Sequence, residues 1–152
     1  MLNKIDIKGG EFTFEQRNDL GELFSSGKTE VEKFKGAFKI LHGIDIDFSD
    51  TEQIKNYIEY FEEIIDGLRF WFEGEKKLLA YKPEPEEIRA GIKELSEKIG
   101  VLGTIKALAK NYSQDPDTIL KWKYGKVFGI LYADLEEYKY QKRLHKQYGQ
   151  KK

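Results

Sequence analysis

The sequence predicts a mainly α-helical protein: a compact multi-helix domain of about six helices, with a long C-terminal helix and a short N-terminal β-hairpin. Three observations predict this class. Apolar residues recur every three or four positions along most of the chain, the spacing of one face of an α-helix. Residues typical of helix N-caps precede these stretches. Residues 4–14 instead alternate polar and apolar side chains around Gly9-Gly10, as a hairpin does.

Composition excludes several classes of protein. The chain has 152 residues, 39% of them hydrophobic, and a formal net charge of −1. This length leaves room for a real core, and the near-neutral charge argues against binding nucleic acid or membranes by charge alone. The absence of cysteine excludes disulfides, thiol catalysis and cysteine-bound metals. No apolar stretch approaches a membrane span or a secretion signal, so we expect a cytoplasmic protein without membrane contact.

Three helices are predicted in the N-terminal half, after the hairpin. Each begins at a capping box, in which Ser or Thr is followed three residues later by Glu or Gln. These boxes are Thr13 with Gln16, Thr29 with Glu32, and Ser49 with Glu52. The second helix is expected to end at Gly43 in a left-handed cap, and the third to run to about Leu79. Gly67 lies inside the third helix, where it predicts a kink or a close helix contact.

Residues 82–85 (Lys-Pro-Glu-Pro) are the clearest break in the helical pattern, because a residue before proline avoids the helical conformation. We therefore predict two helical lobes. The N-terminal lobe, residues 1–82, contains the hairpin, and the C-terminal lobe, residues 83–152, contains the long terminal helix. The two lobes are also compatible with a single domain.

The C-terminal lobe is expected to contain three helices. Apolar spacing predicts one over residues 88–99 and another over residues 102–112, separated at Gly100. The third begins with Asp115 as N-cap, before a proline, and runs to Tyr148. Unbroken, it would be roughly 45–50 Å long. That is longer than a small domain needs, so we expect its far end to project or to meet a partner.

No catalytic, cofactor-binding or metal-binding constellation is visible, so we do not expect an enzyme. His42 and His145 lie far apart near predicted helix ends, without a carboxylate at metal-ligand spacing. The adjacent pairs Glu62-Glu63 and Glu136-Glu137 would point about 100° apart on a helix and cannot share a proton. The glycines of residues 100–103 follow a helix rather than a strand and lack the lysine of a phosphate-binding loop.

Residues 108–126 allow an alternative function, a helix-turn-helix DNA-binding regulator. The small, apolar and aromatic packing positions of such a unit would be Ala109, Ile119 and Trp122. The DNA-binding side chains would be Lys121, Lys123 and Lys126. However, Ser113 stands where these motifs usually have glycine, and the broad apolar stripe beyond it must be buried in protein. A helical corner with the same packing is the favoured explanation of these residues.

Aromatic side chains surround the terminal helix at several angles. They are either half-buried residues whose hydroxyl groups reach water, or a partner-binding surface, since Tyr and Trp are enriched at interfaces. The candidate partner-binding residues are Trp122, Tyr124, Phe128, Tyr132, Tyr138 and Tyr140.

Part of the chain resembles a known class of proteins. Residues 91–95, 115–117, 122–127 (Trp-Lys-Tyr-Gly-Lys-Val) and 135–138 resemble small proteins encoded in phage and prophage tail operons, and are most similar to tail assembly chaperones. The resemblance covers roughly the last 60 residues, and the first 80 only in helical character.

The resemblance implies a non-enzymatic phage- or prophage-derived assembly factor without a cofactor. Its partners would be phage tail proteins, the tape-measure or tube subunits, which it would keep soluble until assembly. It implies a location in the cytoplasm of the bacterial host cell or in the virion, and self-association into a homo-oligomer is compatible with it. It identifies no contact residues.

Overall fold

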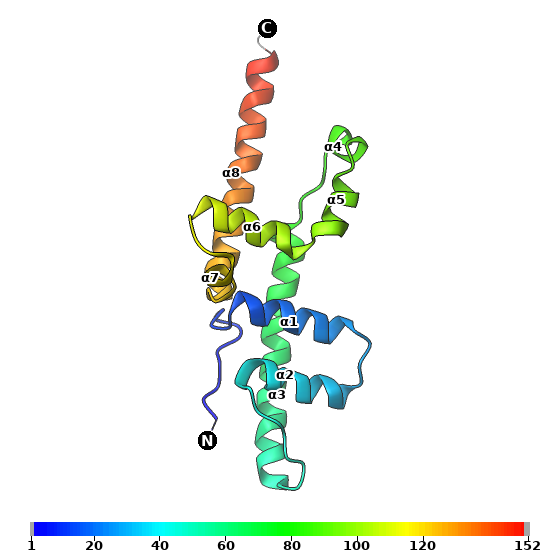
Figure 1. The fold of residues 1–152 in the computed structure, drawn as a ribbon, viewed down its shortest axis with the longest axis vertical. Coiled ribbons are helices and arrows are strands. Elements are labelled where there is room, and N and C mark those ends of the chain that lie inside the picture. Colours follow the sequence, from blue (N-terminus) through cyan, green and yellow to red (C-terminus); the bar gives the residue numbers. More distant parts are fainter. Residues whose placement is uncertain (1, 151–152) are drawn as a thin grey trace.

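The computed structural model describes residues 2–150, which contain eight α-helices, one π-helical turn and no strand (Figure 1). The mainly α-helical class is confirmed, whereas the expected count of about six helices and the N-terminal hairpin are wrong. The elements are α1 Phe14–Ser25, α2 Glu30–His42, α3 Thr51–Gly74, the π-helical turn η1 Glu75–Leu79, α4 Pro85–Arg89, α5 Ile92–Ile99, α6 Val101–Asn111, α7 Pro116–Leu120 and α8 Tyr124–Gln150.

The first three helices begin at or next to the predicted capping residues. The hydroxyl groups of Thr13 and Thr29 accept hydrogen bonds from the backbone three residues later, as predicted for α1 and α2. The N-cap of α3 is Asp50 rather than Ser49. Ser49 instead donates its hydroxyl to Asp47, at 2.7 Å, so it is not available as a cap.

The N-terminal segment, residues 2–13, forms no hairpin. Its end runs antiparallel to the residues that precede α8: Phe14 N donates to Trp122 O at 2.9 Å, and Tyr124 N donates to Phe12 O at 2.6 Å. The alternating residues of the expected second strand therefore pair with a distant part of the chain and not with residues 4–7. A two-stranded hairpin alone is marginally stable, and this pairing places Phe12 fully inside the core.

The N-terminal segment then lies along α3. Trp71 Nε1 donates to Ile7 O at 2.7 Å, and Ile5 N donates to the Tyr60 hydroxyl at 2.8 Å. The close contact predicted at Gly67 exists, but with this segment rather than with another helix. A Cβ at Gly67 would lie 2.8 Å from side-chain atoms of Ile7.

The C-terminal helices are shorter than predicted. The helix expected from Asp115 to Tyr148 is broken: α7 ends at Leu120 and α8 begins at Tyr124, because the residues between them pair with the N-terminal segment. The helix expected over residues 88–99 is also two helices, since Gly91 has a φ of 93°, which interrupts a right-handed helix.

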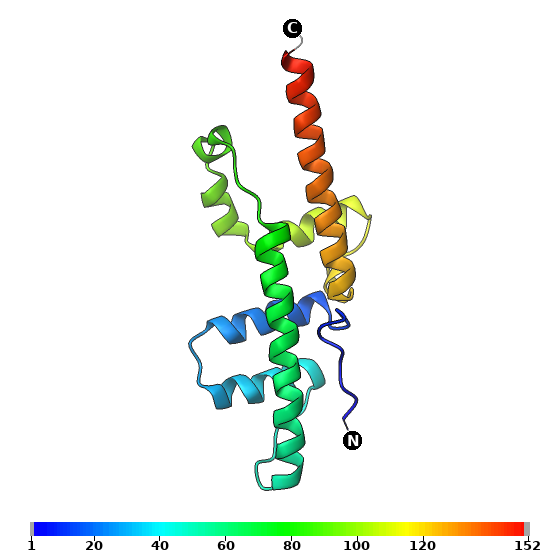
Figure 2. The same ribbon diagram turned by 180° about the vertical axis from the view of Figure 1, so that it is seen from behind.

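One hydrophobic core unites these elements except α4 and α5. It contains residues from both sides of the break at residues 82–85, such as Phe38 and Ile64 before it and Ile119 and Val127 after it. The division into lobes at residue 82 stays a prediction. In Figures 1 and 2, α3 and α8 both run along the long axis, α1 and α2 cross one side of α3, and the second half of α8 projects beyond the core.

Candidate protein-interaction site

The helical pair α4–α5, here called the arm, contributes nothing to the core. No residue between Arg69 and Thr104 is buried. Apolar residues nevertheless follow helical spacing along the arm and into α6, and they are exposed. These are Ile88 (44% exposed), Leu95 (51%), Ile99 (42%), Val101 (43%) and Leu102 (67%). Such a run of exposed apolar residues on consecutive elements is typical of an interaction surface.

A polar cluster ties α4 of the arm to α8. Tyr81 donates its hydroxyl to Glu87 Oε1 at 2.5 Å, and Lys142 Nζ donates to the Tyr81 hydroxyl at 2.6 Å and to Glu87 Oε1 at 3.0 Å. Tyr81 also packs edge-on against Tyr138 of α8. Glu84 extends the cluster through ion pairs of 3.9 Å with Lys142 and 3.7 Å with the lysine one turn later.

The cluster keeps its charges over a wide pH range. The hydrogen bonds from Tyr81 and then Lys142 lower the pKa of Glu87 to about 2. The hydrogen bond to Glu87 raises the pKa of Tyr81 to about 12. The pKa of Lys142 is raised, first by its hydrogen bond to Tyr81. The connection between arm and α8 is therefore insensitive to pH near neutrality.

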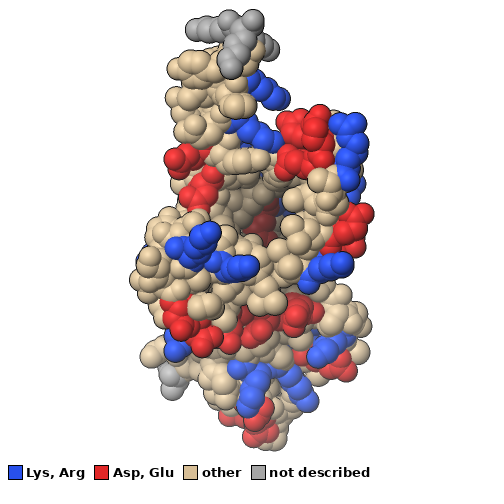
Figure 3. Space-filling model, turned by 45° about the horizontal axis from the view of Figure 1, so that its top comes forward, with Lys and Arg blue, Asp and Glu red and all other residues tan. Residues whose placement is uncertain are grey.

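The molecule is hollowed between the arm and the projecting half of α8 (Figure 3). A groove of about 470 Å³ lies there, lined by Glu84 and Glu86 on the arm side and by Tyr138, Gln141 and Lys142 on α8, among others. Its two walls come from elements that meet through a few polar contacts and not through a packed core. A segment of another protein could occupy this hollow without displacing any buried residue.

The six aromatic residues predicted to bind a partner do not form one surface. Tyr124 is buried, with 2% of its surface exposed, and Trp122 and Phe128 pack against the core. Tyr132, Tyr138 and Tyr140 lie on the projecting part of α8 and are 39%, 44% and 52% exposed. Only these last three are accessible to a partner in this structure.

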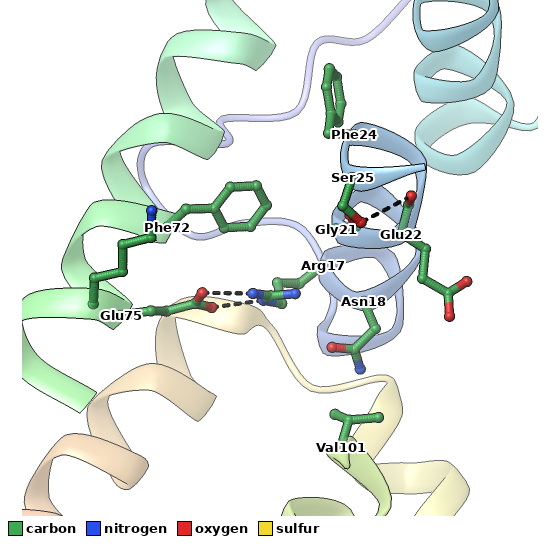
Figure 4. A pocket seen from close by; sticks show the side chains of 10 residues that line it. Arg17, Asn18, Gly21, Glu22, Phe24, Ser25, Phe72, Glu75 and Val101 are labelled. Atoms are coloured by element: carbon green, nitrogen blue, oxygen red, sulfur yellow. Dashed lines mark hydrogen bonds and ion pairs between the residues drawn. The ribbon is translucent and has the colours of Figure 1, made fainter. Parts of the chain in front are cut away.

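A second groove, of about 600 Å³, lies between α1, the end of α3 and the start of α6 (Figure 4). Arg17 spans it with a bidentate pair to Glu75, at 2.7 Å (Nε to Oε1) and 2.6 Å (NH2 to Oε2). The guanidinium group lies 4.8 Å from the centre of the Phe72 ring. Tyr124 also donates its hydroxyl to Glu75, so one carboxylate joins α1, η1 and α8. The charged groups that span the groove, Arg17 and Glu75, are thus paired with each other within the chain.

The residues of the helix-turn-helix alternative are only partly brought together. Ala109 and Ile119 are buried, and Ser113 is the one non-glycine among the described residues with positive φ, 52°, as a tight helical corner requires. However, α7 has only five residues, which is short for a recognition helix. Lys121, Lys123 and Lys126 therefore do not share one helix, and two of them make contacts within the chain. Lys123 donates to a backbone carbonyl of the N-terminal segment, and Lys126 lies over the Trp122 ring.

His42 forms a hydrogen bond that depends on its protonation state. Its Nε2 lies 2.8 Å from the Tyr60 hydroxyl, which already accepts the backbone N–H of Ile5. The hydroxyl proton of Tyr60 is therefore available to donate to a neutral His42 ring. Burial lowers the pKa of His42 below its ordinary value of 6.5.

We expect this contact to make stability depend on pH. A folded-state pKa below the unfolded value of 6.5 means that the stabilisation is complete above pH 6.5 and is lost as the pH falls through the folded pKa. Urea unfolding at about pH 7.5 and about pH 5.5 should show a lower free energy of unfolding at the acidic pH. In His42→Gln, which keeps a hydrogen-bond acceptor but does not titrate, this pH difference should shrink. An unchanged difference in the variant would assign it to other groups.

Sequence reasoning missed both polar clusters. Arg17 and Glu75 are about 60 residues apart in the sequence, as are Tyr81 and Lys142, and nothing in the local pattern links the members of either pair.

Among residues 2–150 no group of three or more His, Asp or Glu could hold a metal ion, and no helix is long and apolar enough to cross a bilayer. No protein-family model, curated protein or solved structure matches the chain.

Proposed function

We propose that this chain is a non-enzymatic assembly factor that binds an apolar segment of another protein along the arm and the facing side of α8. The observation that carries this proposal is the arm itself, whose apolar residues are exposed although they follow helical spacing. An isolated helix as short as the eight residues of α5 is marginal in water. A partner that covers its apolar face would therefore stabilise both the arm and the complex.

The exposed area is large enough to matter for binding. Full burial of a Leu, Ile or Val side chain is worth roughly 1.5–3 kcal/mol, and these residues are about half exposed. Covering four of them would then contribute about 4 kcal/mol before the cost of association. The hollow beside them adds the accessible aromatic residue Tyr138 of α8, which suits a mixed apolar and polar contact.

The proposed partners are phage tail proteins, the tape-measure or tube subunits. This class comes from the resemblance of residues 91–95, 115–117, 122–127 and 135–138 to tail assembly chaperones. An open apolar surface suits such a role, because a subunit that waits for assembly exposes apolar helix faces that must be kept from aggregating.

The test is co-expression with phage tape-measure and tube proteins, followed by purification through a tag on this chain. We expect Leu95→Asp combined with Ile99→Asp to reduce the recovered partner at least about tenfold, which corresponds to 1.4 kcal/mol. The fold should survive, because neither residue is buried. Helix content measured by circular dichroism checks this.

The matched control is Lys93→Asp, which changes the net charge by the same amount on the opposite face of α5. It should leave partner recovery unchanged. Equal recovery with the Leu95/Ile99 variant and the wild type would exclude the arm as the binding surface. A tail subunit that stays equally soluble without this chain would contradict the assembly role.

A further inference from the structure

Two segments of the molecule have opposite charge. Residues 138–149, in the projecting half of α8, contain four basic side chains and no Asp or Glu. Residues 44–63, which lead into and form the first half of α3, contain seven acidic side chains and one lysine. Figure 1 places the first turn of α3 and the end of α8 at opposite ends of the long axis. The two surfaces therefore cannot meet within one molecule.

The charged residues of the two helices have the same spacing. One face of α3 carries an acidic stripe and one face of α8 a basic stripe, each with members at relative positions 0, 3, 4 and 7. The acidic stripe is Glu59, Glu62, Glu63 and Asp66, and the basic stripe is Lys139, Lys142, Arg143 and Lys146. Residues three, four and seven apart lie on one side of a helix. This spacing is symmetrical about its midpoint. Each basic residue can therefore face an acidic residue whether α8 of one copy packs parallel or antiparallel to α3 of another.

The acidic stripe is more exposed than the basic stripe, and both have apolar neighbours. All four acidic residues are exposed, and the side of α3 opposite α1 and α2 is uncovered (Figure 2). In the basic stripe Arg143 and Lys146 are exposed, whereas Lys139 and Lys142 are half-buried. Ile58 and Phe70 beside the acidic stripe are 48% and 49% exposed, and Tyr140 beside the basic stripe is 52% exposed. Complementary charges give register and association rate, and the apolar neighbours give area to bury.

We propose that the basic stripe of one copy binds the acidic stripe of a second copy. The two stripes belong to different surfaces, so a copy that uses one still offers the other. Such a heterologous contact produces head-to-tail strings, or rings if the rotation closes. Self-association needs no contact with the apolar residues of the arm, although Lys142 and Lys146 of the basic stripe also line the hollow beside it.

The test uses charge reversals that spare contacts between helices. In the basic stripe, Lys142 bonds to the arm, so Lys139→Glu and Arg143→Glu are combined instead. The Lys139 substitution removes only an ion pair of 3.6 Å with Glu136 of the same helix. In the acidic stripe, Glu63 and Asp66 form ion pairs of 3.0 and 3.6 Å within the chain, so they are left unchanged. The reversal of that stripe combines Glu59→Lys with Glu62→Lys. All the substituted side chains lie on the surface, and circular dichroism checks that each variant folds.

Light scattering at low ionic strength should show wild-type mass rising with concentration to at least twice the 17.8 kDa of one chain. The mass should return toward one chain in 1 M salt, where the Debye length is about 3 Å. Each reversed variant alone should stay at the mass of one chain. An equimolar mixture of the two variants should regain the higher mass, since each reversed stripe then faces its complement.

Three outcomes would overturn the proposal. One is a wild-type mass that stays at one chain at high concentration and low salt. Another is a mass increase that neither reversal changes, which would place self-association elsewhere. The third is a mass increase of the wild type that occurs only with an added DNA duplex and is absent in the basic-stripe variant. This result would assign the basic stripe to nucleic-acid binding.

Discussion

Replacing Gly10 with alanine is expected to lower the free energy of unfolding by about 3 kcal/mol. Gly10 has a φ of 77°, a left-handed conformation that costs a residue with a Cβ about 1–2 kcal/mol. A Cβ there would also lie 2.6 Å from the Cα of Gly125 and 2.8 Å from its nitrogen. Backbone atoms cannot rotate away, so the N-terminal segment must separate from the start of α8. The hydrogen bond from Gly125 N to Gly10 O, at 3.1 Å, would be strained or lost.

Gly125 is the matched control, because it lies on the other side of the same contact. A Cβ there would be 3.4 Å from the Cα of Gly10, an ordinary van der Waals distance. Gly125 also lies in the first turn of α8, where alanine has the higher helix propensity. Gly125→Ala should therefore be neutral or slightly stabilising in chemical denaturation. If Gly10→Ala and Gly125→Ala lower the free energy of unfolding equally, the close approach of the two backbones is not what makes Gly10 sensitive to substitution.

The Gly10–Gly125 contact also shows what the sequence could not predict. Helix starts were predictable at Thr13 and Thr29, because capping is local chemistry within a few residues. The end of the third helical stretch near Leu79 and the extended residues around Pro83 were predictable for the same reason. The break before Tyr124 was not. It results from pairing with a segment more than one hundred residues away, which overrides a continuous helical pattern.

The candidate site was also predictable from the sequence only in part. The sequence identified aromatic residues on the terminal helix, but the periodic pattern could not tell which half of that helix the core would cover. Tyr124 is in the core and Tyr140 is exposed, although both belong to the same aromatic series. The sequence also could not predict that the arm is exposed, since Leu95 and Ile99 have the spacing of core residues. A sequence pattern predicts an apolar face, whereas only the arrangement of helices determines whether that face has a neighbour.

Glu75→Ala is expected to lower the free energy of unfolding by about 2–3 kcal/mol. Removal of one partner from a buried ion pair typically costs 3–5 kcal/mol, because the other charge stays buried without compensation. Here the side chains of Arg17 and Glu75 are 23% and 19% exposed, so water reaches the pair and reduces the cost. The substitution also leaves the buried hydroxyl of Tyr124 without its acceptor, which adds a desolvation penalty.

Glu73→Ala is the control, since Glu73 is exposed, lies in the same helix and forms no ion pair or side-chain hydrogen bond among the described residues. It should change stability by less than about 0.5 kcal/mol. Combining Arg17→Met with Glu75→Ala should cost less than the sum of the two single substitutions, because the charge left unpaired by either one is then absent. Additive costs would show that the two side chains act independently.

The same site gives a pH dependence with a defined sign. Burial, and then the hydrogen bond to Glu75, raise the pKa of Tyr124 above its ordinary value of 10. A raised folded-state pKa means that the stabilisation is complete below pH 10 and is lost as the pH rises further. The wild type should therefore lose stability above pH 10 more steeply than Tyr124→Phe, which has nothing to ionise at this position. Equal slopes would mean that ionisation of Tyr124 does not affect the stability of the folded chain.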